Sequence, residues 1–129
     1  MGTMVYETAR MTAELLEATG IFRHVLIHGG PPDKAAEDIL REPGAAVVYT
    51  GEEGQPSGSA LRREPVFSVV LKTSAPGRGE NSVKTTGEVL DAVFGALREL
   101  SPAFWRVSGL SSGKGANLCR IDFRLRLKG

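Results

Sequence analysis

The chain has little of what catalytic, disulfide-bonded and membrane proteins need. Its 129 residues include one cysteine, two histidines and an aromatic fraction of 6%. A lone cysteine, Cys119, excludes a disulfide within the chain, which fits a reducing compartment. The sequence holds no apolar run of membrane-spanning length, and its first residues lack the apolar core of a signal peptide. We therefore expect a protein that is assembled from the cytoplasm and has no membrane partner.

Charge is nearly balanced overall but unevenly divided. The net charge of +1 disfavours a dedicated nucleic-acid binder. Residues 1–64 carry ten acidic and six basic side chains, whereas residues 65–129 carry five acidic and ten basic ones. The hydrophobic fraction of 41% and this length are typical of one soluble domain, which we place at residues 1–129. An acidic half and a basic half can pair within a chain or between copies of it.

Residues 118–128 have the most regular pattern in the chain. Every second residue is apolar, and the residues between them are mostly charged. Because side chains alternate between the two faces of a strand, this pattern predicts a strand with one buried face and one basic face. Such a strand favours an antiparallel or mixed sheet that is covered on one side only. The apolar positions are Cys119, Ile121, Phe123, Leu125 and Leu127.

The remaining patterns complete an α+β fold. Two main helices pack on one face of a mostly antiparallel sheet of about five strands, with a short extra helix. We expect mobile polar loops at residues 51–59 and 75–80. Gly87 and Gly95, inside the longest helix, are expected to permit close packing against the sheet. The predicted helices span residues 6–19, 33–41 and 83–100, and the predicted strands span residues 21–28, 45–50, 66–73, 103–110 and 118–128.

No arrangement of residues predicts catalysis or a cofactor. His24 and His28 share a strand face about 13 Å apart, too far for one metal ion. Glu52 and Glu53 lie in a polar loop where two carboxylates would be solvated. Residues 111–115 join two strands, whereas a phosphate-binding loop leads from a strand into a helix. We therefore predict no enzyme, metal or cofactor, and a core or interface position for Trp105.

The order of elements is similar to that of a family of phage proteins. The N-terminal helix, the strand EPVFSVVLKT at residues 64–73, the helix TGEVLDAVFGAL at residues 86–97 and the closing strand follow the same plan. Together they resemble the phage tail terminators and the related minor tail proteins of Mu-like prophages. The resemblance covers most of the chain and does not extend to residues 29–43.

This resemblance implies a structural function in the virion tail. Such proteins form a hexameric ring on the finished tail tube, stop its polymerisation and join it to the head–tail connector. Arg78, Glu52 and Glu53 are then expected to contact the tube or the lumen, where DNA passes. The expected contacts with neighbouring copies or other partners are Arg62, Arg63, Arg120, Arg124, Arg126 and Lys128.

Two alternatives remain for the basic face of the last strand. It is either a solvated sheet surface without a partner, or the binding surface of a nucleic-acid module. The second alternative uses Arg120, Arg124, Arg126 and Lys128 and predicts binding that falls steeply with salt.

Overall fold

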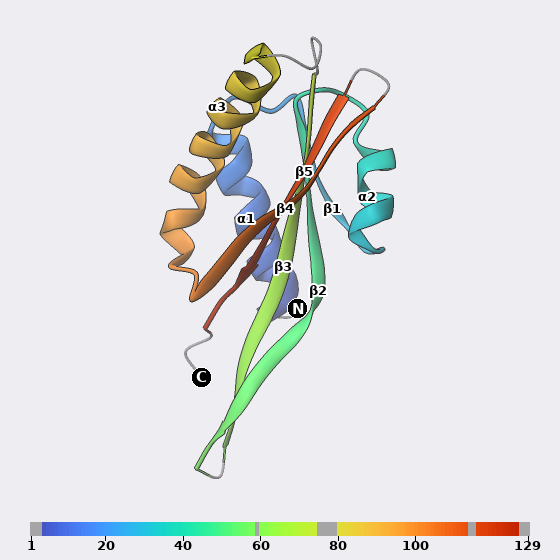
Figure 1. Ribbon diagram of the computed structural model, residues 1–129. Helices are drawn as coiled ribbons and strands as arrows, with labels where there is room; N and C mark the ends of the chain where they lie inside the picture. Colours follow the sequence, from blue (N-terminus) through green and yellow to red (C-terminus); the bar gives the residue numbers. More distant parts are fainter. Residues whose placement is uncertain (1–3, 59, 75–79, 114–115, 127–129) are drawn as a thin grey trace.

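The computed structural model describes residues 4–58, 60–74, 80–113 and 116–126. They form a five-stranded, mostly antiparallel sheet with helices, which confirms the predicted α+β class (Figure 1). Among the described residues, no helix combines the length and apolar character needed to cross a membrane. The elements are α1 Met4–Ala18, β1 His24–His28, α2 Pro32–Asp38, β2 Gly44–Ser57, β3 Ala60–Ser74, α3 Glu80–Leu97, the 3₁₀ turn η1 Arg98–Leu100, β4 Phe104–Gly113 and β5 Ala116–Arg124.

The strands lie in the order β1-β2-β3-β5-β4. β1 runs parallel to β2, and the other three pairings are antiparallel. The two edges of the sheet are therefore β1, near the start of the chain, and β4. The last strand lies inside the sheet between β3 and β4, so the most regular pattern in the sequence belongs to an interior strand.

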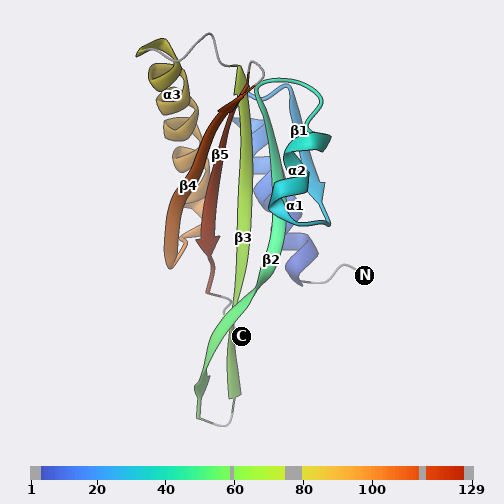
Figure 2. The ribbon, with the colours of Figure 1, turned by 45° about the vertical axis from the view of Figure 1, so that its right-hand side comes forward.

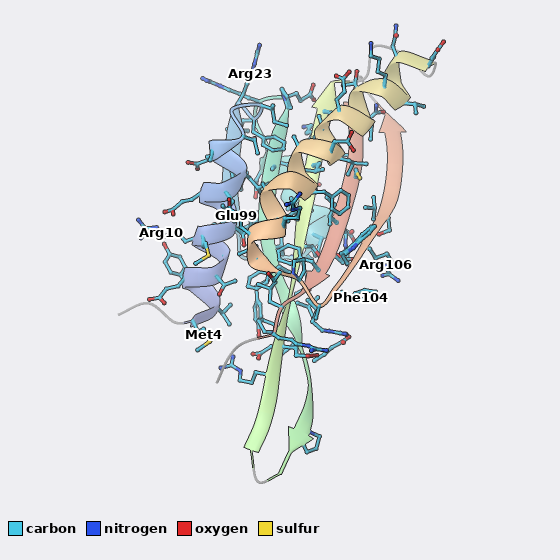
Figure 3. All side chains as sticks on the ribbon, turned by 90° about the vertical axis from the view of Figure 1, so that its left-hand side faces the viewer. Met4, Arg10, Arg23, Glu99, Phe104 and Arg106 are labelled. Carbon is cyan, nitrogen blue, oxygen red and sulfur yellow. The ribbon has the colours of Figure 1, made fainter. Side chains whose placement is uncertain are left out.

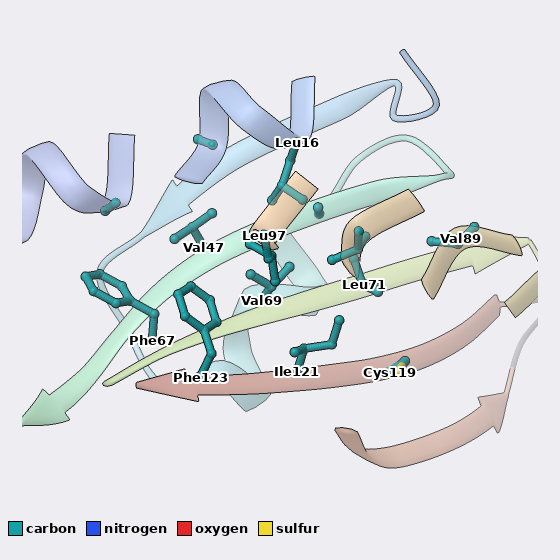
Figure 4. Packing of buried hydrophobic residues seen from close by; sticks show 14 of the residues in the cluster. Leu16, Val47, Phe67, Val69, Leu71, Val89, Leu97, Cys119, Ile121 and Phe123 are labelled. Carbon is teal, nitrogen blue, oxygen red and sulfur yellow. The ribbon is translucent and has the colours of Figure 1, made fainter. Parts of the chain in front are cut away.

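The helices α1 and α3 cover one face, called here the helix face. Cys119, Ile121 and Phe123 of β5 are all buried there, as the alternation predicted. Phe67 of β3 stacks on Phe123 with ring centroids 5.8 Å apart (Figure 4). Complete burial of side chains of this size stabilises the fold by about 1.5–3 kcal/mol each. This cluster is the main core.

The opposite face, called here the open face, is covered only in part. The predicted short helix is α2, and its Ala35 and its C-cap Ile39 pack on Ala46, Val48 and Val70 of β2 and β3. The expectation of a sheet covered on one side only is therefore wrong for this half of the sheet. Residues 45–48 are buried on both faces because α2 adds a second apolar layer. Figure 2 shows α2 beside β1 and β2, away from β4.

The two histidines attach α2 to the edge strand β1. His24 Nδ1 accepts a hydrogen bond from the Leu40 amide, and His28 Nδ1 accepts one from the Gly30 amide. Because Nδ1 of His28 is an acceptor, its Nε2 carries the proton and faces Asp38 Oδ2 at 2.6 Å. Among the described residues, no group of three or more potential ligands could hold a metal ion.

Glycines in this fold differ sharply in what surrounds them. A Cβ added at Gly87 or Gly95 of α3 would meet nothing within 4 Å, so the expected close packing there is wrong. At Gly44, a Cβ would lie 2.6 Å from the Arg41 carbonyl oxygen. The tight approach of backbones is therefore at the start of β2, not in the long helix.

Candidate interaction site

β2 and β3 continue past the sheet as a two-stranded extension, residues 51–58 and 60–65, called here the arm. The pairing of β1 ends at Val48, and that of β5 begins at Val66, with one further backbone hydrogen bond from the Leu125 amide to the Pro65 carbonyl. Beyond Pro65, β2 and β3 pair only with each other among the described residues. Figure 1 shows the arm extending well beyond the rest of the molecule. The prediction of a mobile loop is wrong for residues 51–57, because these Gly-, Pro- and Ser-containing positions continue a regular ladder. Residue 59, and residues 75–79 of the second predicted loop, lie outside the described residues.

A change of register turns the strand where the arm begins. The register shifts between Tyr49 and Gly51. Gly51 has a φ of +140°, a backbone conformation that residues other than glycine rarely adopt. One extra residue at such a bulge bends the strand and increases its twist. Thr50 donates a hydrogen bond from its hydroxyl to the Val66 carbonyl across this point. The direction of the arm is thus set by a local backbone feature.

Arg63, a predicted partner contact, binds Glu52, a predicted tube or lumen contact, at the base of the arm. Arg63 donates from Nε and Nη2 to the two carboxylate oxygens of Glu52, both at 2.6 Å. Tyr49 donates its hydroxyl to Glu52 Oε2 at 2.7 Å. The hydrogen bonds from Arg63, and then that from Tyr49, lower the pKa of Glu52 to about 2. An exposed pair of this kind adds little stability, but it fixes the side-chain geometry of the strand pair.

The open face beside β4 holds a buried carboxylate, Asp122. Ser68 donates its hydroxyl to Asp122 Oδ1, and Arg120 Nε lies 2.7 Å from the same oxygen. Arg106 of β4 is a looser partner, with Nη2 3.7 Å from Oδ2. Burial alone would raise the pKa of Asp122, but the hydrogen bonds from Arg120 and Ser68, with the charges of Arg120 and Arg106, lower it. Arg120 is therefore paired within its own strand.

Arg124, the next basic residue on this face of β5, connects the sheet to the arm. Its guanidinium forms an ion pair with Glu53 of the arm and lies 3.2 Å from Glu64 at the arm's base. The ring of Phe104 lies 5.4 Å from the same guanidinium, within cation–π range. Arg126 is 3.7 Å from Glu64. A cavity of about 330 Å³ lies between these groups, lined in part by Arg106, Arg120, Asp122 and Phe104.

These contacts decide how much of the predicted basic face is free. Arg120 and Arg124 are held by carboxylates of the same chain, and Arg126 faces one. Arg106, at the sheet edge, is the most exposed of the four, with 67% of its side chain accessible. Lys128, Arg78 and the side chain of Arg62 lie outside the described residues. The sequence placed Glu53 and Arg124 in separate groups, whereas the fold brings them together.

Two exposed aromatic residues at the start of β4 were not predicted as site residues, although Trp105 was expected in a core or an interface. Phe104 and Trp105 are 48% and 56% exposed, on opposite faces of the strand. Trp105 meets Phe94 of α3 edge-on at 4.8 Å, beside a groove of about 530 Å³ lined also by Asp91, Arg98 and Pro102. The signal in the sequence was the adjacent pair of aromatic residues at the start of a strand. Adjacent residues of a strand cannot both point into one core.

Comparison of the chain with protein-family models and with curated proteins found no match. The arm, the charged face and the β4 edge are therefore the features that bear on its function.

Proposed function

We propose that this chain is a structural component of a phage or prophage tail. It acts as a terminator-like protein that forms a ring at the end of the tail tube and joins the tube to the head–tail connector. The observation that carries the proposal is the arm, a two-stranded ribbon that leaves the sheet and, among the described residues, pairs only with itself beyond its base.

The arm is built as a contact element for another molecule. A two-stranded ribbon is marginally stable in water when nothing covers it. The six residue pairs from Glu52–Pro65 to Ser57–Ala60 give the arm a reach of roughly 20 Å. Pro56 and Pro65 lack the amide hydrogen that further strand pairing needs, which protects the arm against uncontrolled strand addition. A surface of this size and regularity is suited to packing against a tube or connector subunit.

The anchoring of the arm supports the same proposal. Arg124 holds Glu53 and approaches Glu64, and Arg63 holds Glu52, so the base is fixed on both of its strands. A fixed base directs the arm, and an arm with a defined direction pays less conformational entropy when it binds. Glu52, Glu53 and Arg63 thus position the arm, and the outer part of the arm makes the contacts with the partner.

The same ion pairs weaken the alternative of a nucleic-acid-binding module. Phosphate binding requires free cationic groups. Arg120 and Arg124 already bind carboxylates of the chain, and a phosphate would have to displace them. A ring protein makes no such demand, because its contacts with neighbours rest on shape and edges as well as on charge.

The proposal expects a tail tube protein to be encoded beside this chain, and it is tested with that protein. Tubes polymerised with the chain present should stop at a uniform length and carry a ring at one end in negative-stain electron micrographs. A variant in which Asn-Gly replaces residues 55–62 keeps the Glu52–Arg63 pair and lacks the outer arm. It should fold, as judged by circular dichroism, and should fail to limit tube length.

Two results would refute the proposal. One is a genomic locus without tail genes. The other is tubes that grow equally long with and without the wild-type chain. The variant Lys84→Glu, which changes an exposed residue of α3, is the matched control and should limit length as the wild type does.

A further inference from the structure

The edge strand β4 has the features of an edge that can pair with a strand of another chain. Along Phe104–Ser108 it pairs with β5 on one side, and no strand lies on its other side among the described residues. Proteins usually protect such an edge with lysine, proline or a covering loop. Here Phe104, Trp105 and Arg106 are exposed in succession, two of them large aromatic residues. An uncovered aromatic edge of this kind promotes pairing with another chain.

The opposite edge of the same sheet, β1, has the same paired length as β4 and the opposite direction. β1 has five residues, and β4 pairs five successive residues, Phe104 to Ser108, before its register shifts. Following the pairings across the sheet, β1 and β4 run in opposite directions. If a second copy is placed beside the first in the same orientation, its β1 therefore meets β4 as an antiparallel strand. Antiparallel pairing is the slightly more stable form.

Charge separates along the same axis. Residues 4–43, which include α1, β1 and α2, carry seven acidic and four basic side chains. Residues 98–126, which include β4 and β5, carry six basic and two acidic ones. Figure 3 shows α1 with Arg10 at one side of the molecule and Phe104 with Arg106 at the other. A head-to-tail contact between copies thus brings unlike charges together, as ring interfaces require.

One pair of residues lies at the two edges on the same face. Arg106 is on the open face of β4, beside Asp122. Asp38 of α2 is also on the open face, where it contacts His28 of β1, and 60% of its side chain is accessible. In a sheet continued from one copy to the next, these two side chains approach each other across the new strand pair.

We infer that copies of this chain join head to tail through β4 of one copy and the β1 edge of the next, so that the sheet continues across the interface. Phe104 and Trp105 are covered at this joint, and Arg106 faces Asp38 of the neighbour. The inference rests on the proposed ring and adds which surfaces form it. Because the two surfaces differ, the contact is heterologous and closes into a ring or grows into a filament.

The single tryptophan of the chain reports on this joint directly. Light scattering and tryptophan emission are measured together while the wild-type protein is concentrated. As the mass rises above that of one chain, the emission of Trp105 should shift to shorter wavelength, and quenching by acrylamide should fall. Assembly without any change in emission would overturn the inference, and so would a wild-type chain that stays monomeric at millimolar concentration.

Charge reversal identifies the partner edge. Arg106→Asp and Asp38→Arg should each raise the Kd of self-association by roughly tenfold or more, because each places like charges opposite each other. An equimolar mixture of the two variants should assemble again, since the reversed pair is complementary and the other joint is that of the wild type. Both variants are first checked for native circular dichroism. Lys84→Glu, about 15 Å along α3 from Phe94, is the control and should leave assembly unchanged.

The remaining outcomes separate this inference from the proposed function. If Asp38→Arg assembles normally and Arg106→Asp does not, two β4 strands pair around a twofold axis, and the head-to-tail joint is wrong. If both single variants assemble like the wild type, the joint lies elsewhere and the inference fails. Tube length is measured in a separate assay. A chain that still limits tube length in either case would keep the proposed function and lose only this joint.

Discussion

The buried carboxylate of Asp122 gives a stability prediction that the structure makes quantitative. In Asp122→Asn the side chain keeps its size but loses its charge, so Arg120 loses its charged acceptor at 2.7 Å and Arg106 loses its nearest carboxylate. Ser68, which is fully buried, keeps an oxygen to donate to if the amide is oriented towards it. A hydrogen bond to a charged group contributes about 1.5–3 kcal/mol. Since 38% of the Arg120 side chain is accessible and water replaces part of the loss, we expect a cost of about 1–2 kcal/mol.

Urea denaturation measures this cost. With an m-value of about 1.5 kcal/mol/M, the midpoint of Asp122→Asn should fall by about 1 M at pH 7. Asp91→Asn, which changes an exposed aspartate of α3, is the matched control and should shift the free energy of unfolding by less than about 0.5 kcal/mol.

The pH dependence of stability separates the effect of the Asp122 charge from that of the side chain's shape. The folded-state pKa of Asp122 lies below its ordinary value of 3.8. The charge therefore contributes stability that is fully present above pH 4 and is lost as the pH falls through the folded-state pKa. The difference between the wild type and Asp122→Asn should shrink over that range. Equal stability at pH 7, or a difference that stays constant down to pH 2, would refute this account of the cluster.

Further predictions follow from glycine packing, thiol burial and the arm. Gly87→Ala should raise the free energy of unfolding by up to about 1 kcal/mol in urea titrations, because the helix gains propensity and the added Cβ meets nothing. Gly44→Ala should destabilise the fold, since its Cβ would collide with the Arg41 carbonyl; equal stability of these two variants would contradict the packing. Burial raises the pKa of the Cys119 thiol, so it should react with a thiol reagent far more slowly in the native state than in urea. Glu52→Gln should abolish the acid titration that NMR detects at Tyr49 and Arg63, because it removes the carboxyl group whose pKa is about 2.

Local patterns in the sequence predicted the elements in which buried residues recur at a regular spacing. The alternation in residues 118–128 predicted the buried face of β5, because period-two burial has one structural explanation. Gly20 ends α1 as a helix-terminating glycine does, with a φ of +75°. The arm was missed for the opposite reason. Its glycines, prolines and serines favour loops, and only the facing strand, which local patterns do not specify, keeps them extended.

The charges of the last strand show where local reasoning ends. The alternation correctly placed Arg120, Arg124 and Arg126 on one face of the strand. It did not predict which groups these side chains bind. Arg124 is held by Glu53, 71 residues earlier in the chain, and the two meet because β2 passes the end of β5 just after its register shift at Gly51. The acidic half therefore neutralises part of the basic half within one chain, where the arm leaves the sheet. What remains for a second copy is the charge at the two edges, β1 and β4, rather than the charge of the strand with the clearest pattern.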